Sequence, residues 1–222
     1  MQQVFIGIIT EGTTDERFLE KIVERTFIDI AYDCNNDVEP IVRVLHIDKL
    51  DSTFTEWVTK ASKKGVADIG MMVLCIHNDA DDITVEGVLN NKFIPTQTCL
   101  DSEDDLTTCK NIVPIIPIRM IEAWMLADKS LLKEEIGTNL SDNLLGINRA
   151  PQTIADPKSV IKEAIRISRQ NMTQRRRKDL QIGDLYMPIG QKLSIAKLQQ
   201  LSSYQHFQEG VRMAYKKLHL LQ

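Results

Sequence analysis

Acidic residues that directly follow apolar runs are the feature of this sequence with the clearest chemical meaning. Glu11 follows the apolar run at the start of "VFIGIITEGTTDERFLEKI", and Asp79 and Asp81, in "HNDADD", follow the apolar run from Met71 to Ile76. Because the carboxyl ends of parallel strands lie along one edge of a sheet, we expect these groups to meet in space. If the extended conformation continues to Asp81, the side chains of Asp79 and Asp81 point to the same side.

A divalent cation is the expected ligand of these carboxylates. Carboxylates held close together repel one another unless a cation neutralises them, and hard oxygen donors suit Mg²⁺ or Mn²⁺. Glu122, in "RMIEAWMLAD", is expected to join them from the start of a helix, with Arg119 one turn earlier on the same face. We therefore predict one set of metal ligands and catalytic residues: Glu11, Asp79, Asp81 and Glu122. Asp82 is an extra acid without an assigned role.

A simpler interpretation exists for each of these acids. Aspartate is common in turns and at helix N-termini because it stabilises both. Glu122 can be a partner of Arg119 on a solvated helix face.

Strands and helices alternate four times before residue 128, and this alternation would position the acids. "QQVFIGIIT", "PIVRVLHI", "DIGMMVLCIHNDADD" and "NIVPIIPI" have the character of strands. "TTDERFLEKIVERTF" and "TFTEWVTKASKKG" have helical periodicity, with Thr13 and Glu16 fitting a capping box in the first and Gly65 ending the second. The pattern predicts an α/β fold, doubly wound around a mostly parallel sheet. Pro114 and Pro117 make the fourth strand a short or edge strand.

The remaining segments suggest a second part of the molecule. The polar stretch 84–111 is expected to be a mobile connection near the site, and several helical segments follow Asp128. We predict an α/β core over residues 1–128 and a helical extension over 129–222. The pattern does not say whether the extension folds separately.

Composition restricts the class of protein. The chain has 222 residues, 43% hydrophobic and 26% charged, with a net charge of −4, as in an ordinary soluble protein. No apolar run approaches the roughly 20 residues of a membrane span, and no leader-peptide pattern is present, so we expect a cytoplasmic protein. Four cysteines without CxxC spacing indicate reduced structural thiols. The two tryptophans, the methionines and the histidines receive no chemical role.

A local basic segment is the second informative region. Residues 158–178 contain eight basic residues and one acid, Glu163, so the local charge is 8 − 1 = +7. Lys158, Lys162 and Arg166 recur every four residues and would form one stripe on a helix. Such a stripe suits a nucleic-acid phosphate backbone, although a solvated helix face is the alternative. The predicted nucleic-acid contacts are Arg119, Lys158, Lys162, Arg166, Arg169, Arg175, Arg176, Arg177 and Lys178.

These motifs together resemble the Toprim (topoisomerase-primase) superfamily. The resemblance rests on "TEGTTDERFL", on Asp79-Ala80-Asp81 after a later strand, on "RMIEAWMLAD" and on the ending "IGQKLSIAKLQQLSSYQHFQEGV", which look like a small bacterial Toprim-like family. It implies a Mg²⁺-dependent phosphoryl-transfer centre with Glu11 as ligand or acid/base and Asp79 and Asp81 as ligands. It also implies a separate ABC-type ATPase partner and a role in anti-phage or mobile-element defence, like the nuclease half of OLD (overcoming lysogenisation defect) proteins. His77 and Asn78 depart from the usual pattern.

Three functions compete at this stage. The first is a Mg²⁺- or Mn²⁺-dependent nuclease that acts on DNA in preference to RNA; because no GxxxxGK[ST] phosphate loop is present, any ATP dependence would come from the partner chain. The second is a non-catalytic regulatory or scaffold subunit of an ATPase complex. The third is a nucleotide-sugar transferase that uses its DxD pair to hold a metal, which leaves Glu11 without a role. Oligomers are possible in each case.

Overall fold

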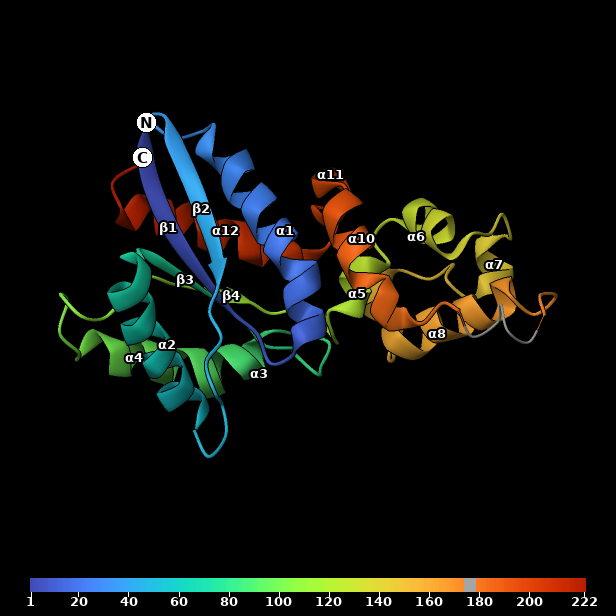
Figure 1. The fold of residues 1–222 in the computed structure, drawn as a ribbon, viewed down its shortest axis with the longest axis horizontal. Helices are drawn as coiled ribbons and strands as arrows, with labels where there is room; N and C mark the ends of the chain where they lie inside the picture. The colour runs from blue at the N-terminus through green and yellow to red at the C-terminus, as the bar shows by residue number, and fades with distance from the viewer. Residues whose placement is uncertain (174–178) are drawn as a thin grey trace.

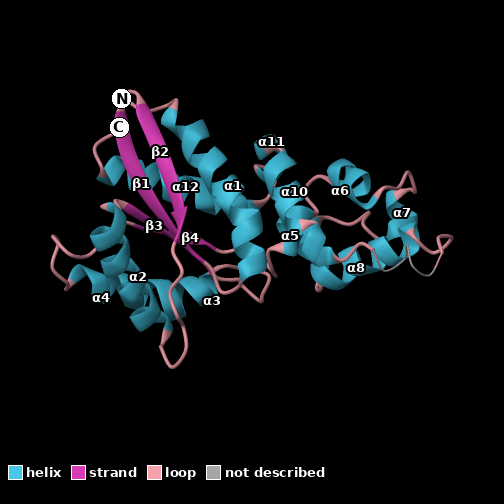
Figure 2. Cartoon of the chain, in the orientation of Figure 1, coloured by secondary structure: helices cyan, strands magenta, loops and turns pink. Residues whose placement is uncertain are grey.

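The fold is a parallel four-stranded sheet with helices on both faces, as predicted. The computed structural model describes residues 1–173 and 179–222. Figures 1 and 2 show the strands together in one half of the molecule. Their order in the sheet is β2 (Val38–Val44), β1 (Gln2–Ile9), β3 (Val73–His77) and β4 (Ile112–Ile115). All three pairings are parallel. Because β2 and β3 flank β1, the direction of winding reverses between β1 and β3.

Alternating side chains of the strands bury two separate apolar layers. Val4, Ile6 and Ile8 of β1 face one layer, which contains helices α1 (Thr13–Ala31) and α12 (Ser202–Lys217). Leu74 and Ile76 of β3 face the other layer, which contains α2 (Phe54–Ile69). A strand buried on both faces is typical of parallel sheets, and β3 is fully buried along its length.

Two predicted details at helix ends were wrong: the cap of the first helix and the end of the second. Helix α1 begins directly after Gly12 as expected, but no side chain caps it, so the Thr13–Glu16 capping box is absent. Helix α2 starts with a capping box between Thr53 and Glu56 and runs past Gly65 to end at Gly70, whose φ of 62° is left-handed. Gly65 lies inside the helix, where a Cβ would collide with the Met71 side chain.

The segment 84–111 is folded, which corrects the expectation of a mobile connection. It contains α3 (Glu86–Val88), a π-helical turn, η1 (Leu89–Phe93), and α4 (Ile94–Asp101). Val88, Phe93 and Leu100 are buried in the layer beside α2. The polar character of the stretch therefore belongs to its outer face. The fourth strand is short and lies at the sheet edge, as its prolines predicted.

Short helices form the other half of the molecule (Figure 1). They are α5 (Glu122–Met125), α6 (Lys129–Ile136), α7 (Asp142–Leu145), η2 (Pro151–Thr153), α8 (Pro157–Ser168), η3 (Ile182–Asp184), α10 (Tyr186–Lys192) and α11 (Ile195–Leu198). The last helix, α12, returns to the sheet: the Asn111 side chain donates to Ala214 O at 3.1 Å and the Tyr215 hydroxyl to Phe27 O at 3.1 Å. The division at residue 128 stays a prediction.

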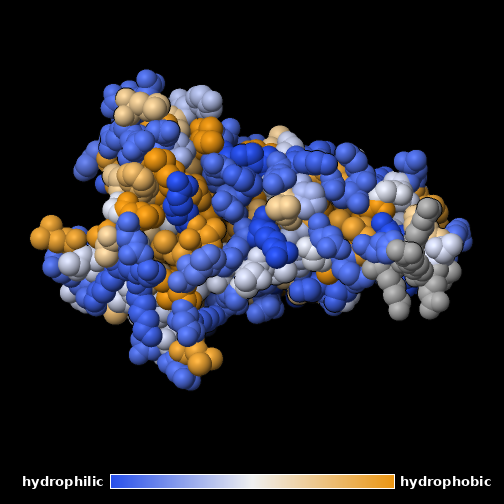
Figure 3. All heavy atoms as spheres, in the orientation of Figure 1, coloured by the Kyte–Doolittle hydropathy of each residue, from blue (hydrophilic) through white to orange (hydrophobic). Residues whose placement is uncertain are grey.

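The surface of the molecule is mixed. On the face seen in Figure 3, hydrophilic side chains cover most of the helical half, and hydrophobic ones gather mainly over the sheet half. Trp57 and Trp124 are core residues, as expected. Within residues 1–173 and 179–222, no helix combines the length and the apolar character needed to cross a bilayer.

Candidate functional site

Glu11 lies at the carboxyl end of β1, in the turn that leads into α1. The Thr10 hydroxyl donates to Gly12 O at 2.9 Å and fixes this turn. The Glu11 carboxylate accepts a hydrogen bond from Lys49 Nζ at 2.5 Å, and both side chains are 40% exposed. Burial raises the pKa of Glu11, but the bond to Lys49 and its charge outweigh burial and lower it. Glu11 also lines a cavity of about 320 Å³ between α1 and the segment after β2.

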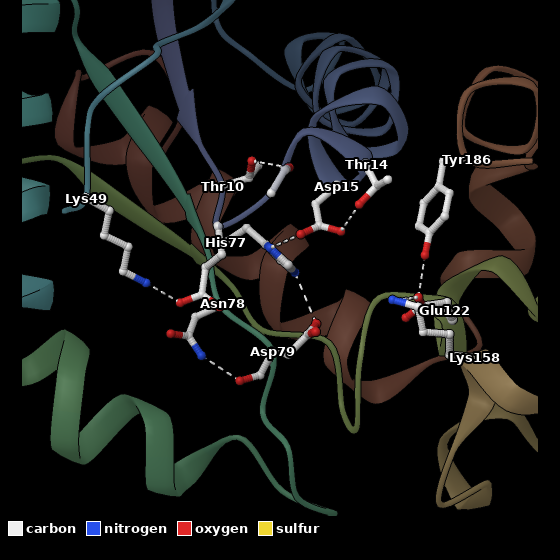
Figure 4. A network of polar contacts seen from close by, with 12 residues as sticks. Thr10, Thr14, Asp15, Lys49, His77, Asn78, Asp79, Glu122, Lys158 and Tyr186 are labelled. Atoms are coloured by element: carbon white, nitrogen blue, oxygen red, sulfur yellow. Dashed lines mark hydrogen bonds and ion pairs between the residues drawn. The ribbon is translucent and has the colours of Figure 1, made fainter. Parts of the chain in front are cut away.

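His77, the last residue of β3, lies between two carboxylates (Figure 4). Its Nε2 is 3.2 Å from Asp79 Oδ1, and its Nδ1 is 3.7 Å from Asp15 Oδ2. The ring is 1% exposed. Burial lowers the pKa of His77, but the hydrogen bond to Asp79 and the charges of Asp79, Asp15 and Glu11 outweigh it, and the net shift is upward. The surrounding carboxylates therefore stabilise the protonated imidazole relative to that of a free histidine.

Asp15 couples the two halves of the site. Its pKa is raised by burial first and then by the charges of Asp79 and Glu122, while His77 and Lys158 oppose the shift. These carboxylates therefore sense one another through a poorly solvated region, where charges interact more strongly than in water.

Glu122 is a buried carboxylate at the start of α5, with 3% of its side chain exposed. The Tyr186 hydroxyl of α10 donates to it, and Lys158 Nζ of α8 lies 3.2 Å from the same Oε1 atom (Figure 4). Burial and the bond to Glu122 both raise the pKa of Tyr186. One carboxylate thus joins three helices, and Lys158 connects it to the basic stripe.

Asp81 and Arg119 lie differently from the sequence-based expectation. Asp81 has a left-handed backbone with φ 53°, and Arg119 one with φ 67°. The Asp81 N–H donates to Arg119 O at 3.0 Å, and the Arg119 N–H donates to Asp82 O at 2.9 Å. The extended conformation therefore ends before Asp81, and Arg119 precedes the helix that carries Glu122. The prediction that Arg119 and Glu122 share one helical face was wrong.

Part of the predicted basic stripe lies on one helix, α8. Lys158, Lys162 and Arg166 are exposed on α8, which begins at Pro157 after the Asp156 N-cap. Arg169 follows the helix end. The remaining four predicted contacts, Arg175, Arg176, Arg177 and Lys178, lie outside the described residues. Nucleic-acid binding by any of these residues stays a prediction.

The predicted metal ligands do not form a finished metal site. In the described part of the chain, no three or more His, Cys, Asp or Glu side chains are arranged to hold a metal ion. The donor chemistry nevertheless fits a hard cation: the acids are oxygen donors, and repulsion among Asp15, Asp79 and Glu122 is what a cation would relieve. Glu11 and Asp79 are instead paired with Lys49 and His77. The ligand set stays a prediction.

The most central residues of this network had no role in the sequence-based set. Asp15 was taken only as part of a helix start, and His77, Lys49 and Tyr186 had no assigned role. A usable signal existed for His77, because it precedes Asp79 by two residues at the end of a strand, where alternate side chains share a face. No comparable local signal marks Tyr186, which lies 64 residues from Glu122.

Fold and site together define an α/β protein with a charged network at the sheet's switch point. Open α/β sheets bind ligands where the strand order reverses, beyond the carboxyl ends of the strands, and here Glu11 and His77-Asp79 follow β1 and β3. Comparisons of the chain with protein-family models, with curated proteins and with solved structures gave no match.

Proposed function

We propose that the protein is a metal-dependent nuclease of Toprim type, with its active site at the carboxyl ends of β1 and β3. The observation that carries the proposal is the placement of Glu11 and Asp79 at the ends of the two strands where the winding reverses. This edge is where the fold class places ligands, and the sequence around both acids resembles the Toprim pattern.

Exchange of Lys49 for a cation at Glu11 has a small energetic cost. The pair between Glu11 and Lys49 is 40% exposed on both sides, and exposed pairs contribute about 0–1 kcal/mol. Asp79 is 30% exposed, so it too can accept a ligand from solvent. Bound Mg²⁺ or Mn²⁺ would activate water and stabilise the leaving oxygen of a phosphodiester. Asp81 and Glu122 have less support as ligands, since the one has a left-handed backbone and the other is enclosed by Tyr186 and Lys158.

Residues of the chain itself would bind and orient the substrate. Lys158 is 48% exposed and touches the edge of the network at Glu122, so its ammonium is placed to hold a phosphate next to the carboxylates. Lys162 and Arg166 continue the positive charge along α8 and would track a nucleic-acid backbone without reading its sequence. His77 would hold the orientation of Asp79.

The wider context of the proposal rests on the resemblance alone. A separate ABC-type ATPase as partner, a role in anti-phage or mobile-element defence, a cytoplasmic location and a preference for DNA over RNA all belong to this part of the proposal.

The test is a cleavage assay of the purified protein on plasmid DNA and on total tRNA, with Mg²⁺, Mn²⁺ or EDTA. Glu11→Gln and Asp79→Asn are the site variants. Asp68→Asn is the matched control, because Asp68 is an exposed acid near the C-terminal end of α2, and among the described residues its ion pair is with Lys64 alone. Metal-dependent cleavage that is lost in both site variants and kept in the control supports the proposal. Cleavage that survives Glu11→Gln refutes the assignment of this site.

A non-catalytic subunit of an ATPase complex is the second candidate. It is favoured by the pairing of Glu11, Asp79 and Glu122 with basic or hydroxyl partners in the chain. Absence of cleavage even with the partner ATPase, together with a stable complex between the two, would make this candidate the better one. The transferase alternative loses support, because Asp81 departs from the extended conformation that would align it with Asp79.

A further inference from the structure

A cavity of about 250 Å³ lies between helix α8 and the turn η3, away from the carboxylate network. Lys162, Arg166 and Arg169 contribute to its wall, and Gln181 lies on the η3 side. We call it the α8 pocket. Its volume is several times the roughly 30 Å³ share of one water molecule, which leaves room for a phosphate group.

The charge of the α8 pocket is one-sided. Three of its lining residues are basic, and none of the described lining residues is acidic. Lys162 makes no ion pair with a described residue. Arg166 bonds Glu163 through Nε and Nη2 at 2.7 and 2.6 Å, but this pair lies on the surface, with the two side chains 65% and 50% exposed. Like charges around one cavity repel one another, and an anion removes that repulsion.

The spacing of the residues connects the α8 pocket to the carboxylate edge. Lys158 and Lys162 are one helical turn apart and Lys158 and Arg166 two turns, which corresponds to about 6 and 12 Å along the axis. Lys158 lies 3.2 Å from Glu122. An extended anionic chain laid along α8 can therefore occupy the pocket and reach the network at the same time.

We propose that the α8 pocket binds one phosphate group of a nucleic-acid strand whose neighbouring backbone lies at the Glu11–Asp79 edge. The guanidinium groups of Arg166 and Arg169 suit phosphate, because their planar array of donors matches its oxygens. The phosphate is either a terminal monoester or an internal diester, and both have the same recognition chemistry. This proposal deepens the proposed nuclease function and rests on it for the identity of the ligand.

The experiment is a binding titration in EDTA, so that it does not depend on cleavage. Fluorescence anisotropy is measured with a short single-stranded DNA that carries a 5′ phosphate, and with the same strand ending in a 5′ hydroxyl, over a series of salt concentrations. The variants are Lys162→Gln and Arg166→Gln. Lys197→Gln, an exposed lysine on α11, is the control that removes the same charge elsewhere.

The expected result is about tenfold weaker binding in each pocket variant, with the salt slope reduced by about one, and less than a twofold change in the control. If the loss is confined to the 5′-phosphorylated strand, the pocket binds a terminal monoester; if both strands lose equally, it binds an internal diester. Pocket variants that bind both strands as the control does would overturn the proposal. Because Lys162 and Arg166 are both exposed, neither substitution should prevent folding. A protein that binds through the pocket but never cleaves would refute the nuclease proposal and leave the pocket intact.

Discussion

Replacing Tyr186 by phenylalanine tests whether the buried carboxylate of Glu122 is a structural junction. Tyr186 is 1% exposed, and its hydroxyl donates to Glu122. Phenylalanine keeps the ring in place and removes only the hydroxyl. The substitution therefore isolates one hydrogen bond between α10 and α5, without the cavity that a smaller residue would leave.

The magnitude follows from the surroundings of the carboxylate. A hydrogen bond to a charged group contributes about 1.5–3 kcal/mol, and its loss leaves a buried acceptor unsatisfied. Lys158 would remain, but its side chain is 48% exposed and its attraction is weakened by solvent. We expect Tyr186→Phe to lower the free energy of unfolding by about 2 kcal/mol. For a chain of this length, that corresponds to a fall in Tm of about 4–8 °C.

The assay is urea unfolding of a double-mutant cycle with Glu122→Gln. The glutamine keeps an acceptor oxygen but loses the charge, so the effect of Tyr186→Phe should be smaller in the Glu122→Gln background. A coupling energy of about 1 kcal/mol or more is expected between these two directly bonded residues. If Tyr186→Phe changes the free energy of unfolding by less than about 0.5 kcal/mol and the coupling is near zero, the junction does not contribute as argued.

Three further changes probe neighbouring parts of the structure. His77→Gln should destabilise the protein most at low pH: the raised pKa of His77 gives stability that is fully present below its unfolded pKa of about 6.5 and is lost as the pH rises through the folded pKa. Urea midpoints of variant and wild type should therefore converge as the pH rises from 5.5 to 8.5, and a gap that widens with pH would contradict the sign. Lys49→Met should change the free energy of unfolding by less than about 1 kcal/mol, since the pair with Glu11 is exposed. It should raise the pKa of Glu11, because the hydrogen bond and charge of Lys49 no longer oppose the effect of burial. An NMR titration that shows no rise in this pKa would refute the pairing. Gly190→Ala should cost about 1–3 kcal/mol by overpacking, because its Cβ would lie 2.5 Å from a backbone oxygen of α1. Gly183→Ala, with open space around it, should cost less. Thermal unfolding of both variants measures the two costs, and equal losses would argue against a close contact between α1 and α10.

The layer architecture was predictable from sequence because it depends on local periodicity. Continuous apolar residues before His77 indicate a strand buried on both faces, and the structure has one there. The boundaries failed where tertiary packing overrides local rules. Gly65 has the residue type of a helix end, but it lies inside α2, where Met71 occupies the space that a side chain would need. The segment 84–111 looked irregular because only a minority of its residues, such as Phe93, face the core.

Of the candidate site, only its position at one edge of the sheet was predictable from the sequence. Parallel topology brings Glu11 and Asp79 to the same edge whatever the side chains do. Which partner each acid selects depends on contacts between distant segments, such as Tyr186 with Glu122 across 64 positions. Backbone turns also matter: one left-handed residue, Asp81, was enough to break the expected alternation.

Asp15 and Asp79 face one histidine, His77, whose Nδ1 and Nε2 lie 3.7 and 3.2 Å from their carboxylate oxygens. Burial raises the pKa of Asp15, and the charges of Asp79 and Glu122 add to this shift. Neutralisation can come from a proton on Asp15 or from a bound cation. These two differ in their pH dependence. The protonated fraction of a carboxyl group falls as the pH rises, whereas a divalent cation then binds more tightly because fewer protons compete for the carboxylate. The gain in Tm on adding Mg²⁺ should therefore grow from pH 5 to pH 7.5 if a cation binds here, and should be absent at every pH if only a proton does.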